Sequence, residues 1–499
     1  SRVRISSSAF ISEMNLQSLK KKRIFNKKYF FVISIFWAVL ITFLNWDNKT
    51  MLNLIPYYLD YADLIRNNFN LNLAEMIQNR PTFPMWGYGF LLNYIDSKIL
   101  LVAFQLILFF LLLSCSFSLR IKKLFGINKS WIPTILLCFP SFIAIFSTLS
   151  TYPVAIFFLT ISIILFGVAF DNFLAYENSI ESDWFFKKCF FIIMLSGLSA
   201  GITMNFRSDY TMFFISVPLI SCLVFYKWLN SRIQFKKTLH KFLVLIIAFY
   251  FSLFSIMTPW MNYTSKNFNK LLLTSSNSGH VLFLGLGQLP NNKWQITTQD
   301  ADAVKRQVLL KNGVKDSLTI EGERILKEEF FRLITESPVE YFKKIVLGIL
   351  RVTFGGIYLP EFFEIPLCDR TNSHKWRISS FVDTISQSKC RQIAKDIAKG
   401  KFQNLYEFPF SYFLRLFLTA LSFFSSILVV LIGLFLIPKF MYKAWKNKSF
   451  VLIISGLAIL YQFLIGIFAF HMPLYMTNVY IFLVIVISHS LSNKSKITT

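Results

Sequence analysis

The sequence predicts an all-α polytopic membrane protein with about ten transmembrane helices and two large loops on the outer side of the membrane. Of its 499 residues, 55% are hydrophobic and only 16% are charged, and the mean hydropathy is +0.52. A soluble chain of this size carries about 25% charged residues. The apolar residues come in uninterrupted runs of about 16–28, the length that crosses a bilayer as a helix. A water-soluble fold is therefore excluded.

The formal net charge of +26 would favour nucleic acid as the partner of a soluble protein. Here the lysine-rich clusters flank apolar runs, as the positive-inside rule expects of cytoplasmic loops. The sequence contains neither a G-x-x-x-x-G-K-[ST] phosphate loop nor a zinc-type cysteine pair. We therefore expect membrane lipids, and not nucleic acid, around this chain.

The predicted spans are residues 29–46, 99–119, 132–147, 151–170, 189–204, 211–226, 242–258, 409–437, 450–470 and 475–492. The first apolar run lacks a small-residue cleavage site, which predicts a retained helix and not a removed signal peptide. With the basic segment 1–28 in the cytoplasm, alternation places the C-terminus there too. The cytoplasmic segments then hold 25 of the 52 Lys and Arg residues but only 5 of the 26 acids. This asymmetry supports a multi-pass topology in the inner (plasma) membrane.

This topology divides the chain into four parts. They are a cytoplasmic N-terminus (residues 1–28), an N-terminal membrane module (29–258), a large outer loop (259–408), and C-terminal helices with a short cytoplasmic tail (409–499). A further outer loop, residues 47–98, lies inside the N-terminal module. The large loop holds Cys368 and Cys390, the only cysteines in a loop. Outside the cytoplasm they could form a disulfide, or both could remain free thiols.

Segment 342–358 is apolar but short, and it could be an eleventh span or a helix in the membrane interface. As a span it would reverse the membrane orientation of every later segment and place the lysines at 439–448 outside. Its own Lys343, Lys344 and Arg351 suit an interfacial helix better. We expect it to lie in the interface.

The first outer loop carries the candidate acid–base residues. Asp60 and Asp63 lie three residues apart, so a helix would place both on one face, with Arg66 a turn further. Such a carboxylate could accept a proton from an incoming nucleophile, and Asp47 is a further candidate. The alternative is a solvated helix face on which Asp63 pairs with Arg66.

Several arginines lie where a lipid phosphate would sit. Arg207 and Asp209 occupy a short connector between two spans, and Arg80 lies in a proline-rich turn of the first loop. The planar guanidinium suits phosphate, although Arg207 and Asp209 could instead pair with each other. Arg415 lies just inside a span and could face a cavity or extend outward to the interface.

His280 and His471 have no Cys, His or carboxylate at metal-ligand spacing in the sequence, so we expect structural roles for both. No metal site and no Ser–His–Asp arrangement is predicted. The acids of the first loop could bind a divalent cation together with a lipid phosphate, but nothing in the sequence fixes its ligands.

A series of short motifs, in order along most of the chain, resembles the GT-C superfamily of polyprenyl-phosphate-sugar glycosyltransferases. The nearest types are the protein mannosyltransferases and the lipid A aminoarabinose transferases. The residues that carry the resemblance are Tyr58 and Ala62, Arg80-Pro81 with Pro84 and Gly87, Gly197 and Gly201 leading to Arg207, Pro259-Trp260, Ser278-Gly279 and Ser337-Pro338 with Tyr341.

The resemblance implies inverting transfer of a hexose or pentose from a polyprenyl-phosphate donor to a glycan, lipid or protein acceptor of the cell envelope. In the family a first-loop Asp acts as general base about four residues before the tyrosine, a position held here by Leu54. The nearest substitutes are Asp60 first and Asp47 second, followed by Asp63. The implied contacts to the donor phosphate are Arg207, Arg80, Lys266, Arg351 and Arg415.

Two other functions remain open. A flippase or carrier for a lipid-linked sugar would need charges in the middle of several spans, and the sequence offers few. An envelope-polysaccharide polymerase or ligase would share the lipid-linked substrate and the large outer loop. It would rely on outer-loop arginines without a first-loop base.

Overall fold

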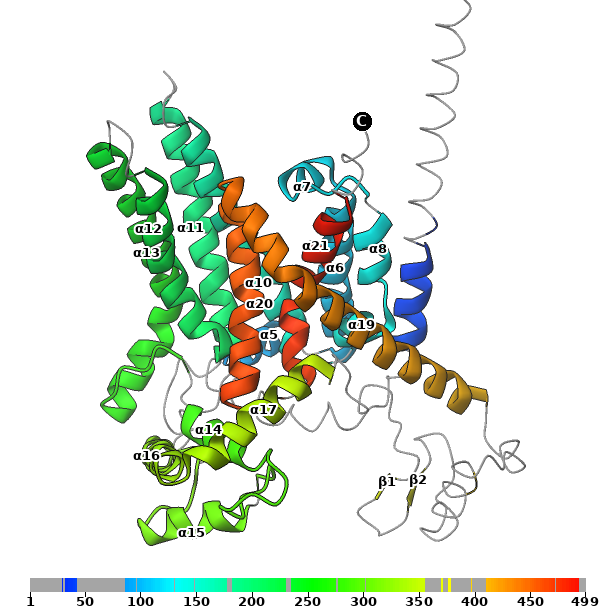
Figure 1. Cartoon of the computed structure of the whole chain (residues 1–499), viewed down its shortest axis with the longest axis vertical. Coiled ribbons are helices and arrows are strands. Elements are labelled where there is room, and N and C mark those ends of the chain that lie inside the picture. The colour runs from blue at the N-terminus through cyan, green and yellow to red at the C-terminus, as the bar shows by residue number, and fades with distance from the viewer. Residues whose placement is uncertain are drawn as a thin grey trace, which may run out of the picture.

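The computed structural model describes residues 29, 32–42, 86–95, 97–129, 131–147, 149–176, 182–229, 235–274, 277–300, 302–354, 369–370, 376–377, 396, 410–471 and 473–492. Within these ranges the chain is helical, apart from two antiparallel two-residue strands, β1 (Asp369–Arg370) and β2 (Trp376–Arg377). Long helices form a bundle, and a unit of shorter helices lies at one end of it (Figure 1). The predicted all-α architecture is confirmed for the described residues.

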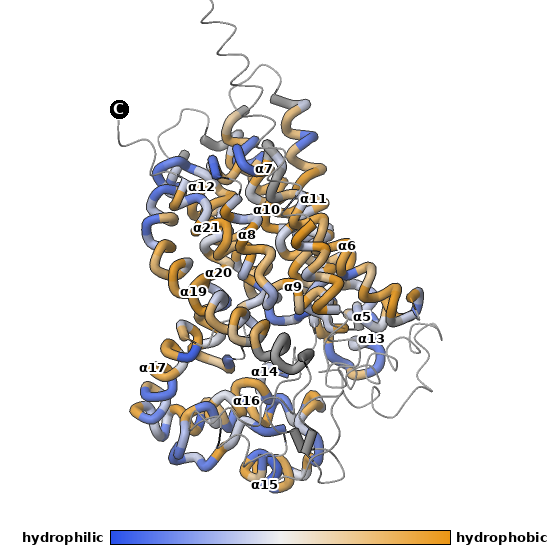
Figure 2. Tube along the Cα trace, turned by 90° about the vertical axis from the view of Figure 1, so that its right-hand side faces the viewer, coloured by the Kyte–Doolittle hydropathy of each residue, from blue (hydrophilic) through white to orange (hydrophobic). Residues whose placement is uncertain are grey.

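Seven stretches of helix are long and apolar enough to cross a membrane. They lie in α10 (Tyr152–Tyr176), α11 (Ser182–Phe206), α12 (Thr211–Leu229), α13 (Phe235–Phe268), α19 (Phe410–Lys446), α20 (Phe450–Phe468), and α21 (Tyr480–Ser492) with the preceding 3-10 helix η4 (Pro473–Val479). These seven match seven of the predicted spans, so the chain is a multi-pass membrane protein. Figure 2 shows the apolar residues concentrated along the bundle.

The other three predicted spans differ from straight membrane helices. Most of the predicted span 99–119 lies in α6 (Lys98–Phe117), which follows α5 (Trp86–Tyr94) at an angle of 119° and could form one broken span with it. Residues 132–147 form two short helices, α8 (Trp131–Leu137) and α9 (Pro140–Ser147), separated just before Pro140. Because proline lacks an N–H, it begins a helix more readily than it continues one. Of the first span, Val32–Thr42 is a short apolar helix.

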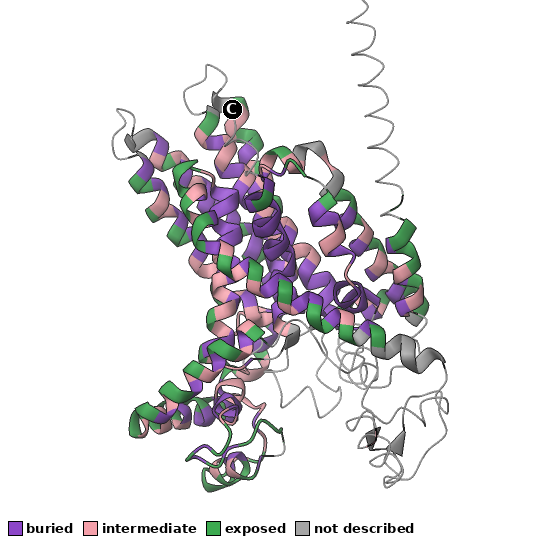
Figure 3. Ribbon diagram, turned by 45° about the vertical axis from the view of Figure 1, so that its right-hand side comes forward, coloured by how far each residue is buried: buried purple, intermediate pink, exposed green. Residues whose placement is uncertain are grey.

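Small and hydroxylated residues let the central helices approach closely. Ser162 of α10 and Ser196 of α11 each donate a hydrogen bond to the other's carbonyl oxygen, at 3.0 and 2.8 Å. On another face of α11, a Cβ added to Gly197 would overlap the carbonyl oxygen of Phe249 in α13. Close packing and hydrogen bonds replace the hydrophobic drive that lipid cannot supply. The buried residues accordingly run through the centre of the bundle (Figure 3).

The unit at the end of the bundle contains α14 (Ser278–Leu286), α15 (Ala303–Lys311) and α16 (Ile320–Glu336). It has its own apolar core, which includes Phe283, Leu326 and Phe330. The carboxylate of Glu323 in α16 accepts hydrogen bonds from the Ser278 hydroxyl and the Gly279 N–H, both at 2.7 Å, at the first turn of α14. Glu323 thereby gives an acceptor to the Gly279 N–H, one of the N–H groups that a helix start leaves without partners.

Helix α17 (Pro338–Phe354) leads from this unit back along the end of the bundle (Figure 1). It is not among the helices long enough to span. One face exposes the apolar side chains of Phe342, Val346, Ile349 and Leu350, while Lys344, Gly348 and Val352 on the other are buried. An exposed apolar face on a short helix beside the spans is consistent with the expected interfacial position. A short helix elsewhere in the bundle region, α7 (Leu119–Leu124), follows α6 in the chain.

Candidate functional site

Only part of the predicted site falls within the described residues. Asp47, Asp60, Asp63 and Arg80 lie outside them, and so do Cys368 and Cys390. Arg415 belongs to α19, but its side chain is not among those described. The roles predicted for these residues, and the alternative disulfide and free-thiol states, therefore stay predictions. Arg207, Lys266 and Arg351 can be placed.

Arg207 lies in the extended connection between α11 and the 3-10 helix η1 (Ser208–Tyr210), and its side chain is buried. Its Nε and Nη2 atoms donate to the carboxylate of Asp209. The guanidinium also packs on two tyrosine rings, 4.1 Å from the centroid of Tyr152 and 5.3 Å from that of Tyr475. The pairing of Arg207 with Asp209, left open by the sequence, is therefore present. Because Asp209 neutralises it, Arg207 offers less free charge to a phosphate than the sequence predicted.

Lys266 lies near the exposed end of α13 and makes no ion pair or ring contact with a described residue. Neither Arg207 nor Arg351 contacts it in the described part of the chain. The three predicted phosphate contacts that can be placed are thus not joined into one cluster by direct contact.

A cluster of polar contacts forms where α17 meets the end of α20. Lys344 Nζ donates hydrogen bonds to the carbonyl oxygens of Ile467, at 2.8 Å, and Ala469, at 2.7 Å. The Tyr341 hydroxyl donates to the carbonyl of Phe468 at 2.9 Å. The last carbonyls of a helix have no partners within it, and a cation there also interacts favourably with the helix dipole. Helix α17 thus caps α20.

Helix α14 and the turn after it hold the same segment from another side. Gln288 Nε2 donates to the carbonyl oxygen of His471 at 2.7 Å, and the His471 N–H donates to Gln288 Oε1 at 3.0 Å. A Cβ on Gly285 would overlap the carbonyl oxygen of Ala469, so the two backbones touch. These contacts fix the main chain at His471 and use neither of its ring nitrogens.

We name Lys344, Arg351 and His471 the basic junction. Lys344 is 1% exposed and His471 7% exposed. Burial, together with a smaller contribution from the charge of Arg351, lowers the pKa of Lys344 to about 7. Burial likewise lowers the pKa of His471 to about 4, with added repulsion from Arg351 and Lys344. The charged groups that act on Lys344 and His471 are therefore all cations.

None of the three side chains forms an ion pair with a described residue, and both ring nitrogens of His471 lack a hydrogen-bond partner there. Leaving a buried polar group unpaired costs about 1–3 kcal/mol. Lys344 also has one N–H beyond the two used on carbonyl oxygens, since an ammonium has three. An anion bound at the basic junction would accept hydrogen bonds from the remaining N–H of Lys344 and from the single N–H of a neutral His471 ring. This arrangement is suited to a phosphate group.

The sequence assigned a binding role to neither Lys344, which it used only as evidence for an interfacial helix, nor His471. Lys344, Gly348 and Arg351 recur at helical spacing, which was a usable signal that two cations share one helix face. The position of His471 beside them depends on long-range packing, because more than a hundred residues separate α17 from the end of α20.

His280 is not the isolated histidine that the sequence suggested. Its Nδ1 lies 3.1 Å from Ser317 Oγ and its Nε2 lies 3.1 Å from Asp300 Oδ1. These contacts bring a serine, a histidine and an aspartate together, which the sequence did not predict. A hydrolytic triad needs an accessible serine and a sheltered carboxylate. Here Ser317 is buried and the Asp300 side chain is 91% exposed, so the contacts hold the unit together.

The described residues contain no group of three or more His, Cys, Asp or Glu side chains that could hold a metal ion. The acids of the first loop lie outside them, so the predicted divalent cation stays a prediction. The chain matches no family model, no curated protein and no solved structure. A functional assignment consequently rests on the residues themselves.

Proposed function

We propose that the chain is a membrane glycosyltransferase that moves a sugar from a polyprenyl-phosphate donor to a cell-envelope acceptor at the outer face of the plasma membrane, with inversion. The observation that carries this proposal is the basic junction, in which the buried Lys344 and His471 and the half-buried Arg351 have no counter-charge among the described residues. A lipid phosphate enters from the bilayer, and α17 lies between the spans and the helical unit. The junction therefore suits the headgroup of a lipid-phosphate donor.

Departure of the phosphate from the sugar leaves negative charge on its oxygens. Groups that are already oriented toward such charge stabilise it without reorganising. The free N–H of Lys344 and the guanidinium of Arg351 would serve this purpose, and a bound phosphate would favour the protonated form of Lys344. Arg207, fixed by Asp209 and two tyrosines, would hold part of the donor or acceptor beside the spans.

The acceptor hydroxyl needs a proton acceptor on the opposite side of the sugar carbon. We assign this role to Asp60 first, and to Asp47 or Asp63 if Asp60 is replaced without effect. The assignment derives from the resemblance and from the helical spacing of Asp60 and Asp63. An Asp60→Asn variant is expected to fold and insert normally but to lose transfer.

A polysaccharide polymerase or ligase is the second candidate. It is favoured by the same basic junction, since such an enzyme would rely on outer cations without a first-loop base. The two candidates differ in their response to Asp60→Asn, because only the glycosyltransferase with an Asp base would lose activity.

The experiment is turnover by the purified, detergent-solubilised protein with a panel of polyprenyl-phosphate sugars, followed as released polyprenyl phosphate. Lys344→Met removes the buried charge, and Lys343→Met is its matched control because the neighbouring lysine is 62% exposed and pairs with Glu340. We expect release to fall at least tenfold in Lys344→Met and to persist in Lys343→Met, since hydrogen bonds to charged groups contribute about 1.5–3 kcal/mol. Equal release by the two well-folded variants would remove the junction from the reaction, and no release from any donor by wild type would refute the glycosyltransferase.

A further inference from the structure

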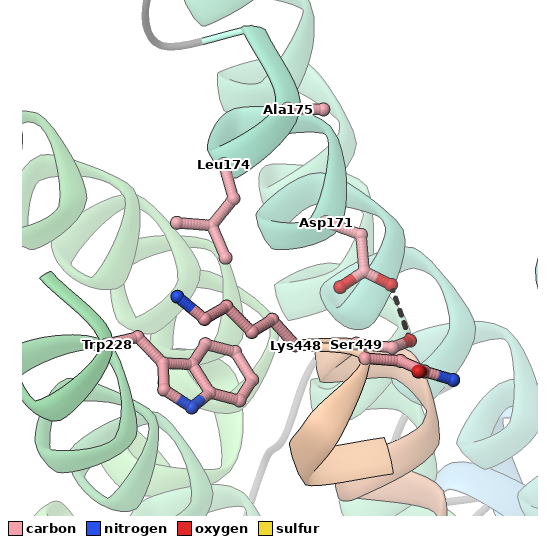
Figure 4. Close-up of a pocket in the computed structure, with 7 residues that line it drawn as sticks. Asp171, Leu174, Ala175, Trp228, Lys448 and Ser449 are labelled. Atoms are coloured by element: carbon pink, nitrogen blue, oxygen red, sulfur yellow. Dashed lines mark hydrogen bonds between the residues drawn. The ribbon is translucent and has the colours of Figure 1, made fainter. Parts of the chain in front are cut away.

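A second polar site lies at the opposite end of the bundle. A cavity of about 400 Å³ opens between the ends of α10 and α12 and the turn that joins α19 to α20. Its lining includes Asp171, Trp228, Asn447, Lys448 and Ser449 (Figure 4). The basic junction and the α14–α17 helices are at the other end, so this cavity is not part of the donor site proposed above.

One wall of the cavity is anionic. Asp171 accepts hydrogen bonds from the N–H groups of Phe450, at 2.5 Å, and Val451, at 3.4 Å, and from the Ser449 hydroxyl, at 3.0 Å. These contacts cap the start of α20 and hold the carboxylate in place. A carboxylate has about four acceptor positions, so it retains capacity for one more donor. Asp171 can therefore cap the helix and still bind a ligand.

Another wall is cationic. Lys448 is exposed and forms no ion pair with Asp171 or with any other described residue. Figure 4 shows its ammonium group apart from the Asp171 carboxylate, with the lysine stem passing beside the Trp228 indole. The main chain of Lys448 has a left-handed conformation, with φ 52°. The Lys448 N–H donates to the Trp445 carbonyl and the Ser449 N–H to the Ala444 carbonyl, both at 3.1 Å. The turn thus fixes where the lysine begins.

The surroundings place the cavity at the depth of lipid headgroups. Tyr226, Tyr442 and Trp445 are exposed around this end of the bundle. Lys227 Nζ lies 5.4 Å from the centroid of the Trp445 ring. Exposed aromatic rings with lysines are typical of the boundary between hydrocarbon and headgroups.

We infer that this cavity binds a phosphoethanolamine group, carried by a phospholipid of the surrounding leaflet. A zwitterion fits because the cavity presents one fixed anion and one unpaired cation on separate walls. The phosphate would pair with Lys448, and the ammonium would donate to Asp171 beside the Trp228 ring. An acidic headgroup without an amine would satisfy Lys448 but would face the Asp171 carboxylate.

The test is native mass spectrometry of the delipidated full-length protein, titrated separately with phosphatidylethanolamine and phosphatidylglycerol of identical acyl chains. Lys448→Asn removes the charge while keeping a residue that tolerates the left-handed conformation. Lys446→Gln, an exposed lysine at the end of the same helix, is the control. We expect wild type to bind one phosphatidylethanolamine about tenfold more tightly than Lys448→Asn does, as the loss of one charge-assisted contact implies. Lys446→Gln should bind like wild type.

The lipid comparison tests the anionic wall without mutating Asp171, whose replacement would also uncap α20. Phosphatidylglycerol that binds as tightly as phosphatidylethanolamine would overturn the inference, and so would equal losses in Lys448→Asn and Lys446→Gln. A third arm adds soluble O-phosphoethanolamine to the lipid-loaded protein. If it displaces the lipid at equal concentration, the ligand is a soluble compound and the lipid assignment is wrong. Persistence of the bound lipid supports it.

Discussion

Binding of a lipid phosphate at the basic junction should be accompanied by proton uptake at Lys344. Burial and the neighbouring Arg351 reduce the pKa of this lysine from 10.5 to about 7 in the folded chain. The corresponding cost of charging the amine is about 5 kcal/mol, at about 1.4 kcal/mol for each tenfold change. At pH 8, above this pKa, only a minority of the protein therefore carries the proton on Lys344. A bound phosphate stabilises the ammonium and raises its pKa, so the remaining molecules take up a proton on binding.

Isothermal titration calorimetry with polyprenyl phosphate at pH 8, in buffers of different ionisation enthalpy, measures this uptake directly. We expect uptake of up to one proton per phosphate bound by wild type and by Lys343→Met, and no uptake by Lys344→Met. Protonation of Lys344 favours binding of the phosphate but disfavours folding of the unliganded protein. Because the unfolded lysine binds the proton more tightly, unliganded protein should become more stable as the pH rises from 7 toward 10.5. Binding without proton uptake, or uptake that survives Lys344→Met, would refute the role of Lys344.

Three further predictions test the framework and the site. Gly285→Ala should weaken the contact between α14 and the end of α20 by about 1–3 kcal/mol and lower the melting temperature, because its Cβ would overlap a backbone oxygen. Gly313→Ala is the comparison: its Cβ would meet open space, so it should cost only about 1–2 kcal/mol, from its left-handed backbone. Arg207→Met should lower the free energy of unfolding by about 3–5 kcal/mol, because it leaves the Asp209 carboxylate without its ion-pair partner. Adding Asp209→Asn should restore part of that loss. A double variant as unstable as the single variant would contradict the pairing. Asp60→Asn should abolish release of polyprenyl phosphate with an unchanged melting temperature, and unchanged turnover would move the base to Asp47.

The membrane architecture could be predicted because it depends on local composition. Each of the seven matching spans is a long apolar run, and a bilayer rewards such runs wherever they occur in the chain. The segment 132–147 is equally apolar, but it divides into two short helices just before Pro140. A hydropathy sum does not register that interruption.

The basic junction could be predicted only in part. The spacing of Lys344 and Arg351 fixes their common helix face, whereas the position of His471 depends on how α14, α17 and α20 pack together. The same holds for His280, whose partners Asp300 and Ser317 lie 20 and 37 residues further along the chain. Arg207 shows the converse, because its partner Asp209 is two residues away and the sequence already offered that pair.

The most direct test is a cryo-electron microscopy map of the full-length protein with a non-cleavable polyprenyl phosphonate bound. We predict phosphonate density within hydrogen-bond distance of Lys344 Nζ, with Arg351 and the His471 ring around it and the lipid chain leaving along α17. Phosphonate density that lies away from all three side chains, in a well-resolved map, would contradict the proposed donor site.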